Sequence, residues 1–300
     1  MTGPGRPAGT TSPNDRPSVT STGMLPRPRT PEGWAGLAAL LHEPASALIA
    51  LDFDGTLSPI VADPAAARAH PAAAAVLRRL SAVIGTLAVI TGRPAAVAVE
   101  LGGFADVPGL IVLGHYGWER WHDGTLSSPP APPGVAAARA QLPRVLAAAG
   151  APQGTWTEEK GIAVAVHTRR AADPQAALEA LRGPLTALAA RTGLTVEPGR
   201  LVIELRPPGT DKGAALKTLV TERHPMSVTF AGDDLGDAAA FGAVRALRAS
   251  GLPGLTVCSG SAETAGELVD AADLVVDGPD GIIALLEQLA GAVTGQPASG

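Results

Sequence analysis

Two carboxylates at the end of a predicted strand are the first residues here whose types and spacing suggest chemistry. Asp52 and Asp54 follow the apolar run 47–50, which predicts a buried strand. Because side chains alternate along a strand, residues two apart point to the same side. Two buried carboxylates repel each other, so a positive group is expected between them, most simply a divalent metal ion. A nucleophilic aspartate, an acid–base aspartate and Mg²⁺ outline a phosphoryl-transfer site; an ordinary Asp-Gly surface turn is the alternative.

Polar groups of complementary type follow other predicted strands or begin the helices beside them. They are Thr91, Lys212, Asp233, Asp234 and Asp237. In an open parallel sheet, ligands bind at the edge formed by the carboxyl ends of the strands. Carboxylates suit a metal ion and a nucleophile, while a hydroxyl and an ammonium suit phosphate oxygens. The types of these residues therefore agree with the chemistry suggested by the first pair.

Several of these residues also have an ordinary structural interpretation. Thr91 and Asp234 could cap the helices that follow them. Lys212 could be a solvated lysine in a first helical turn, although the helix dipole disfavours a cation there. The combination of all these groups along one sheet edge favours the phosphoryl-transfer site.

The elements that must position these residues alternate between strand and helix. Buried-strand patterns lie at 47–50, 87–90, 109–113, 228–231, 255–258 and 274–276. Helical patterns lie at 31–42, 71–84, 94–101, 211–220, 238–247 and 281–290. Such alternation predicts an α/β fold with a Rossmann-like parallel-sheet core, covered by helices on both faces.

A second, smaller α/β domain is expected inside this core. Helical patterns at 135–149 and 174–192 alternate with strand patterns in 155–169, 194–197 and 201–205. The predicted domains are therefore a core formed by 31–119 and 207–292 and an inserted cap at 120–206. Residues 1–30 are rich in Gly, Pro, Ser and Thr, which predicts a disordered tail.

Composition limits the class of protein. The 300 residues are 46% hydrophobic and 17% charged, which is typical of globular chains. A formal net charge of −5 argues against a nucleic-acid partner held by a broad basic face. The single cysteine, Cys258, excludes an intramolecular disulfide and a zinc site of several cysteines. The absence of a long apolar segment and of a signal-peptide core predicts a cytoplasmic protein without a membrane partner; protein partners are not indicated.

The order of these motifs resembles the haloacid-dehalogenase superfamily of phosphatases. Within it, the chain is similar to the trehalose-6-phosphate phosphatase family, whose α/β cap is inserted between Thr91 and Lys212. The stretches that carry the narrower resemblance are 51–60, 114–119, 158–161, 167–169, 204–207 and 211–213. The resemblance covers roughly residues 35–290.

The resemblance implies roles for the core residues. Asp52 is the expected nucleophile, which forms an aspartyl-phosphate. Asp54 is expected to protonate the leaving sugar oxygen and then to activate water. Thr91 and Lys212 are expected to bind the phosphoryl oxygens.

The resemblance also implies a metal site and a sugar site. Mg²⁺ is expected to be held by Asp52, Asp233 and the backbone carbonyl of Asp54, with Asp234 and Asp237 in supporting positions. In the cap, the expected contacts to sugar hydroxyls come from two residues, Glu158 and Lys160. Further candidates for substrate binding are Arg93, Glu204 and Arg206. A surface ion pair of Arg93 and a pair between Glu204 and Arg206 are the alternatives, and the roles of His115 and His167 stay open.

One departure from the family concerns the last acidic motif. The family often has Gly-Asp-Asp-x-Thr-Asp-Glu, whereas Gly236 and Ala238 stand here in place of Thr and Glu. The acidic residues Asp233, Asp234 and Asp237 remain. The outer part of the metal site is therefore expected to differ, with the activity retained.

The leading hypothesis is Mg²⁺-dependent hydrolysis of trehalose 6-phosphate to trehalose and phosphate, in trehalose biosynthesis. A phosphatase of the same design could instead act on another sugar phosphate, such as a sucrose or glucosylglycerol phosphate, and a mutase shares the nucleophile. A receiver-type signalling module needs neither Asp54 nor a cap. A non-catalytic regulatory homologue is the other alternative, against which the intact set Asp52, Asp54, Lys212 and Asp233 argues.

Overall fold

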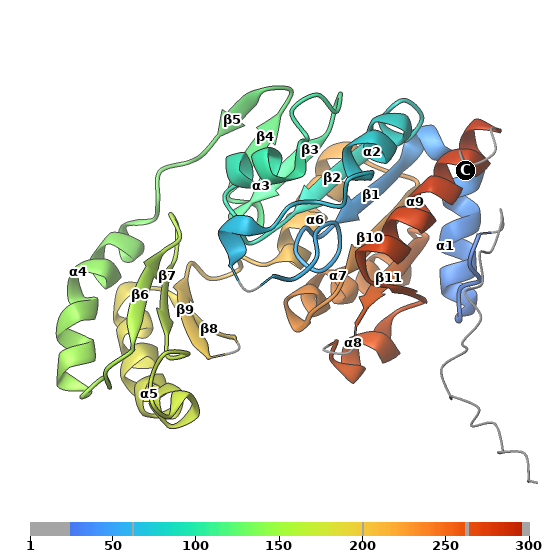
Figure 1. Ribbon diagram of the computed structural model, residues 1–300. Coiled ribbons are helices and arrows are strands. Elements are labelled where there is room, and N and C mark those ends of the chain that lie inside the picture. Colours follow the sequence, from blue (N-terminus) through green and yellow to red (C-terminus); the bar gives the residue numbers. More distant parts are fainter. Residues whose placement is uncertain (1–24, 62, 200, 262–263, 296–300) are drawn as a thin grey trace, which may run out of the picture.

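The computed structural model describes residues 25–61, 63–199, 201–261 and 264–295, which form two β-sheets with helices packed on them (Figure 1). The larger sheet has eight strands in the order β12-β11-β10-β1-β2-β3-β4-β5. Its strands are β1 Ala47–Leu51, β2 Thr86–Ile90, β3 Ile111–Gly114, β4 Glu119–His122, β5 Thr125–Ser127, β10 Ser227–Gly232, β11 Gly254–Gly260 and β12 Leu274–Asp277. From β12 to β3 neighbouring strands are parallel, and β4 and β5 continue the sheet in antiparallel pairing.

Helices cover both faces of the eight-stranded sheet. The helices on one face are α1 Pro31–His42, α2 Ala73–Ser81, α3 Ala95–Gly102 and α9 Gly278–Thr294, and those on the other are α6 Lys212–Arg223, α7 Ala238–Ala249 and α8 Gly266–Ala271. Side chains of β1 alternate between these two layers: Ile49 and Leu51 pack on the first, Leu48 and Ala50 on the second. Burial on both faces explains why the sequence of β1 is apolar without interruption.

The central strands bring the functional sequences together. β1 lies between β10 and β2, and Leu51 is paired with Ala231. The amide of Asp52 donates a hydrogen bond to the carbonyl of Ala231 at 2.8 Å. Parallel pairing in this register puts the residues after β1 directly beside the residues after β10. Short 3₁₀ helices lie in the connections: η1 Pro44–Ser46, η2 Pro64–Ala66, η3 His115–Gly117 and η4 Leu235–Asp237.

The second sheet belongs to an inserted unit, residues 133–206. Its four strands run in the order β6-β7-β9-β8. The elements are α4 Pro133–Ala148, β6 Trp156–Glu159, β7 Val164–His167, α5 Pro174–Thr192, β8 Thr195–Gly199 and β9 Val202–Arg206. Ile203 and Leu205 pack with α4 and α5 in a separate hydrophobic cluster, which leaves the alternate residues of β9 on the opposite face. In Figure 1 the unit lies to one side of the larger sheet, joined to it by the connections from β5 to α4 and from β9 to α6.

The α/β class and the largely parallel core are confirmed. The larger sheet extends to Ser127, beyond the boundary expected at residue 119, because β4 and β5 pair antiparallel with β3. These short strands and α8 lack the periodic patterns that revealed the longer elements. Cys258 lies buried in β11, as expected. Within the described residues, no helix combines the length and apolar character that crossing a membrane requires.

The prediction of a disordered tail was wrong for its last residues. Leu25 packs against the hydrophobic core, and Arg29 forms hydrogen bonds with the residues just before β12. The Arg29 amide donates to the Asp273 carbonyl at 2.7 Å, and its guanidinium donates to the Ala272 carbonyl at 2.9 Å. Composition could not reveal these bonds, because their acceptors lie far away in the sequence. The rest of the predicted tail, residues 1–24, lies outside the described residues.

The packing of α1 on β11 gives a test of the fold. A Cβ atom at Gly36 would lie 2.0 Å from the Gly254 carbonyl oxygen, so Gly36→Ala forces the helix away from the strand. We expect this substitution to lower the free energy of unfolding by about 1–3 kcal/mol in urea titrations. Gly242→Ala is the matched control, because nothing lies within 4 Å of a Cβ in this helical position. It should stabilise the protein by about 0.5–1 kcal/mol; equal effects of the two substitutions would contradict the packing described.

Candidate active site

A buried ammonium between two buried carboxylates forms the centre of the candidate site. The Nζ atom of Lys212 lies 2.7 Å from an oxygen of Asp52 and 2.7 Å from an oxygen of Asp237. The three side chains are between 0% and 7% exposed. Charges so far from water are stable only with close partners, so each group requires the other two. The structure thereby brings together residues that the sequence places at three different points of the chain.

Local hydrogen bonds place the lysine and its second partner. Asp211 caps α6 by accepting a bond from the Ala214 amide at 2.8 Å, so that the helix begins at Lys212. Asp237 accepts bonds from the amides of Asp233 and Asp234, at 2.9 and 3.2 Å, through its other oxygen. Asp237 thus connects the lysine to the loop after β10.

Asp234 has the capping role that the sequence left open. Its carboxylate accepts a bond from the Gly236 amide at 2.9 Å, within a capping box of η4 that also includes Asp237. The two small residues that depart from the family motif, Gly236 and Ala238, leave this acidic framework intact.

The electrostatics of the cluster favour an additional cation. Burial raises the pKa of Asp52, although the Lys212 ammonium lowers it in part. Burial also raises the pKa of Asp233 to about 7, and the carboxylates of Asp237 and Asp234 add to this rise. For Lys212, burial alone would lower the pKa, but Asp237 and Asp52 outweigh burial and raise it well above its ordinary value. The single ammonium cannot balance three neighbouring carboxylates.

The donor atoms fit a divalent metal ion. Oxygens of Asp52, Asp233 and Asp237 all lie within 4.8 Å of one another. Asp237 is already engaged by Lys212 and two amides, so Asp52 and Asp233 offer the freer oxygens. Gly55 has a left-handed backbone, φ +76°, and a Cβ there would lie 2.0 Å from an oxygen of Asp233. Only glycine lets the chain after Asp54 approach this carboxylate so closely, and hard oxygen donors of this kind suit Mg²⁺ or Ca²⁺.

Asp54 points to a different partner. Its two oxygens accept bonds from Nε and Nη2 of Arg93, both at 2.7 Å. Arg93 also donates to the Pro64 carbonyl at 2.8 Å. Of the two interpretations of Arg93, the structure shows the ion pair. The Thr91 hydroxyl accepts a bond from the Arg93 amide at 3.1 Å.

A cleft of about 880 Å³ separates this cluster from the inserted unit. The core side is lined by Lys212, Asp233 and Asp234, and the inserted unit contributes Lys160, Glu204 and Arg206. The second group pairs within its own unit: Lys160 bonds to Glu204 at 2.8 Å, and Arg206 bonds to Glu197 at 2.8 Å. The predicted alternative of a pair between Glu204 and Arg206 was therefore wrong. These residues are two apart on β9, so their side chains lie on the same face of the strand, but each has a partner of its own.

Glu204 and Lys160 combine charge with free bonding capacity. One oxygen of Glu204 is buried and has no hydrogen-bond partner among the described residues. Burial lowers the pKa of Lys160, but the Glu204 carboxylate outweighs this effect and raises it. Glu158 instead bonds to His167 at 2.7 Å and is not among the described residues that line the cleft.

Several cleft residues were not identified from the sequence. Arg169, Tyr116 and Glu197 line the cleft as well. Arg169 ends the stretch 167–169 and Tyr116 lies in the stretch 114–119, and both stretches belong to the resemblance described above. His115 is buried, with Nε2 3.7 Å from an oxygen of Glu119, and burial lowers its pKa. No local pattern marked Glu197.

A parallel sheet with an inserted α/β unit, and carboxylates and a lysine at its carboxyl edge, define the haloacid-dehalogenase fold with a cap-type insertion. The structure of an Aspergillus fumigatus trehalose-6-phosphate phosphatase is similar, with 25% identity, a TM-score of 0.66, and coverage of 89% of this chain and 100% of that chain. A model of the trehalose-phosphatase family matches residues 50–272. The chain therefore belongs to the trehalose-phosphatase family.

Relatives match this chain over part of their own length. A Mycobacterium avium trehalose-phosphate phosphatase is 36% identical over 213 residues, which cover 67% of this chain and 52% of that protein. An uncharacterized glycosyl hydrolase of Mycobacterium tuberculosis is 38% identical over 208 residues, 65% of this chain and 15% of that protein. The chain thus spans about half the length of the first relative and a small part of the second.

The metal site can be tested without measuring turnover. Asp233→Asn removes one charge from the donor set, so we expect the dissociation constant for Mg²⁺ in titration calorimetry to rise at least about tenfold. Asp270→Asn, which neutralises an exposed carboxylate of α8, should leave it unchanged. Equal Mg²⁺ affinity in the two variants would exclude Asp233 as a ligand.

Proposed function

We propose that the protein hydrolyses trehalose 6-phosphate to trehalose and phosphate, with Mg²⁺ as its metal ion. The observation that carries the proposal is the position of Asp52, a buried carboxylate held by Lys212 at 2.7 Å at the end of the central strand. The names of its relatives support the substrate, since the M. avium protein is a trehalose-phosphate phosphatase. Because a phosphorylated sugar does not cross membranes freely, the proposed setting is trehalose biosynthesis in the cytoplasm.

In the first step, Asp52 acts as the nucleophile. One of its oxygens is held by Lys212, and the other attacks the phosphorus as the bond to the sugar 6-oxygen breaks. The products of this step are an aspartyl-phosphate and the sugar alkoxide, which takes a proton from Asp54. Both Asp54 oxygens accept bonds from Arg93 in this structure, so one of these bonds must open for Asp54 to carry the proton, while the other keeps the acid oriented.

In the second step, Asp54 takes a proton from a water molecule that attacks the phosphorus of the aspartyl-phosphate. The bond between phosphorus and the Asp52 oxygen breaks, which releases phosphate and restores the carboxylate. Lys212 and Thr91 hold the phosphoryl oxygens throughout. Mg²⁺ held by Asp52 and Asp233, with the Asp54 carbonyl, would offset the repulsion between an anionic substrate and Asp52.

The inserted unit supplies the proposed sugar site and acts as a cap over the cleft. Lys160, Glu204 and Arg206 present charged donors and acceptors to the cleft, opposite Lys212. The unpartnered oxygen of Glu204 is suited to a sugar hydroxyl, which would satisfy a buried acceptor. We further propose that Glu158 joins this set when the cap closes, with Arg93 acting on Asp54 and not on the sugar.

Phosphate release from a panel of sugar phosphates tests the function. With Mg²⁺ present, we expect trehalose 6-phosphate to have the highest kcat/KM, above sucrose 6-phosphate and glucosylglycerol phosphate. Asp52→Asn should lower kcat for trehalose 6-phosphate at least about a thousandfold, because an amide cannot form the acyl phosphate. The exposed Asp270→Asn serves as the control and should keep full activity. Preference for another sugar phosphate would refute the substrate, and an active Asp52→Asn variant would refute the mechanism.

The contact between Arg93 and Asp54 leads to a separate prediction. Arg93→Gln removes the group that orients the acid, so kcat for trehalose 6-phosphate should fall about 10–100-fold. For p-nitrophenyl phosphate, whose leaving group needs no protonation, the fall should be much smaller. Steady-state kinetics with both substrates measure the difference, and Arg245→Gln on the exposed side of α7 is the control. Equal losses for the two substrates would mean that Arg93 does not act through Asp54.

A further inference from the structure

Tyr116 is held in a strained backbone conformation beside residues 91–94, which join β2 to α3 and form the proposed phosphate-binding loop. It has φ 58° and ψ 35°, in the left-handed region that residues other than glycine rarely adopt. Its amide donates a hydrogen bond to the carbonyl of Thr91 at 2.9 Å. Its hydroxyl end lies beside Gly92, where a Cβ would come within 2.8 Å of the hydroxyl oxygen. Backbone and side chain of Tyr116 are thus both fixed against the loop that contains Thr91.

The ring of Tyr116 connects this loop to the inserted unit. The guanidinium carbon of Arg206 lies 4.6 Å from the ring centroid, a cation–π contact. The same guanidinium bonds to Glu197 at 2.8 Å, and the Arg206 side chain is only 11% exposed. Arg206 belongs to β9, whereas Tyr116 follows β3, so this contact links the two sheets across the cleft.

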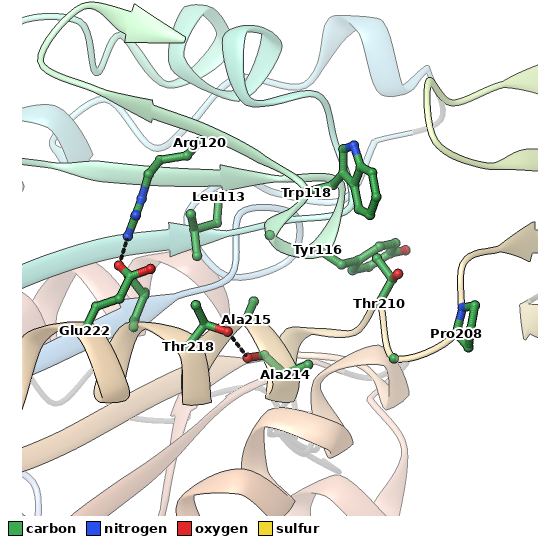
Figure 2. Close-up of a pocket in the computed structure, with 13 residues that line it drawn as sticks. Leu113, Tyr116, Trp118, Arg120, Pro208, Thr210, Ala214, Ala215, Thr218 and Glu222 are labelled. Carbon is green, nitrogen blue, oxygen red and sulfur yellow. Dashed lines mark hydrogen bonds and ion pairs between the residues drawn. The ribbon is translucent and has the colours of Figure 1, made fainter. Parts of the chain in front are cut away.

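Tyr116 also separates two cavities. It lines the cleft together with Lys212 and Arg206, and it lines a second cavity of about 280 Å³ together with Trp118 and Thr210. Figure 2 shows its ring at the end of this second cavity where Thr210 and Pro208 lie, away from Arg120 and Glu222. Residues 208–210 belong to the connection from β9 to α6. The ring therefore stands where the cleft, the phosphate-binding loop and this connection meet.

We propose that Tyr116 is a positioning residue that determines selectivity: it holds Arg206 on the cleft wall and fixes the inserted unit relative to Thr91. The inference rests on the proposed function, because it concerns how a sugar phosphate is favoured over a small phosphate ester. Without the ring, Arg206 loses its support from the core and keeps only Glu197. The phosphate chemistry of Asp52 and Lys212 needs neither contact.

Kinetics of Tyr116→Leu and Tyr116→Phe with two substrates test this role. For trehalose 6-phosphate, Tyr116→Leu should raise KM about 3–30-fold, the range expected for a partly buried cation–π contact. Its kcat/KM for p-nitrophenyl phosphate should change less than about twofold, because the phosphate chemistry of Asp52 and Lys212 does not use the cation–π contact. Tyr116→Phe, which keeps the ring, should restore the KM for trehalose 6-phosphate to near the wild-type value. A merely structural role of Tyr116 would lower both activities together.

A double-mutant cycle identifies the partner. Arg206→Gln should raise KM as Tyr116→Leu does, and the double variant should be little worse than either single one. If Tyr116→Leu does not fold, as judged by thermal unfolding, Arg206→Gln tests the same contact from the inserted unit. Unchanged KM in Tyr116→Leu, parallel losses on both substrates, or additive effects would each overturn the inference. A wild type that does not hydrolyse trehalose 6-phosphate would instead overturn the proposed function, and this inference with it.

Discussion

The ammonium of Lys212, buried between Asp52 and Asp237, is the interaction on which the remainder of the site depends. Each carboxylate lies 2.7 Å from it, and all three groups are nearly inaccessible to water. Removing one partner of such a buried set leaves an uncompensated charge, which typically costs about 3–5 kcal/mol. Asp237 in turn accepts bonds from the amides after β10, so the ion pairs that hold Asp52 also shape the loop containing Asp233.

The parallel sheet makes this arrangement possible. Because β1 and β10 are neighbours in register, their carboxyl ends meet at one edge, and the residues that follow them share a site. The apolar strands and the helices on both faces keep that edge rigid. Close approach of the Gly55 backbone to Asp233 then completes the acidic cluster. The excess of negative charge in this cluster is what favours a divalent cation over a second buried ammonium.

The inserted unit completes the cleft with charges of its own. Its core-facing residues form pairs within the unit, Lys160 with Glu204 and Arg206 with Glu197, so they are oriented before any substrate arrives. Orientation in advance reduces the entropy lost when a ligand binds. Tyr116 and Arg206 provide a direct contact between this unit and the core.

The sequence by itself determined which candidate reactive groups are present and in what order they occur along the chain. Asp52, Thr91, Lys212 and Asp233 follow strands or begin helices, and local hydrophobic patterns were sufficient to locate these particular strands and helices. Only the tertiary structure decided the partners: Arg93 with Asp54, Lys160 with Glu204, Arg206 with Tyr116, and residues 25–30 on the core. These contacts join residues distant in the chain, through strand pairing and side-chain packing that no local pattern encodes.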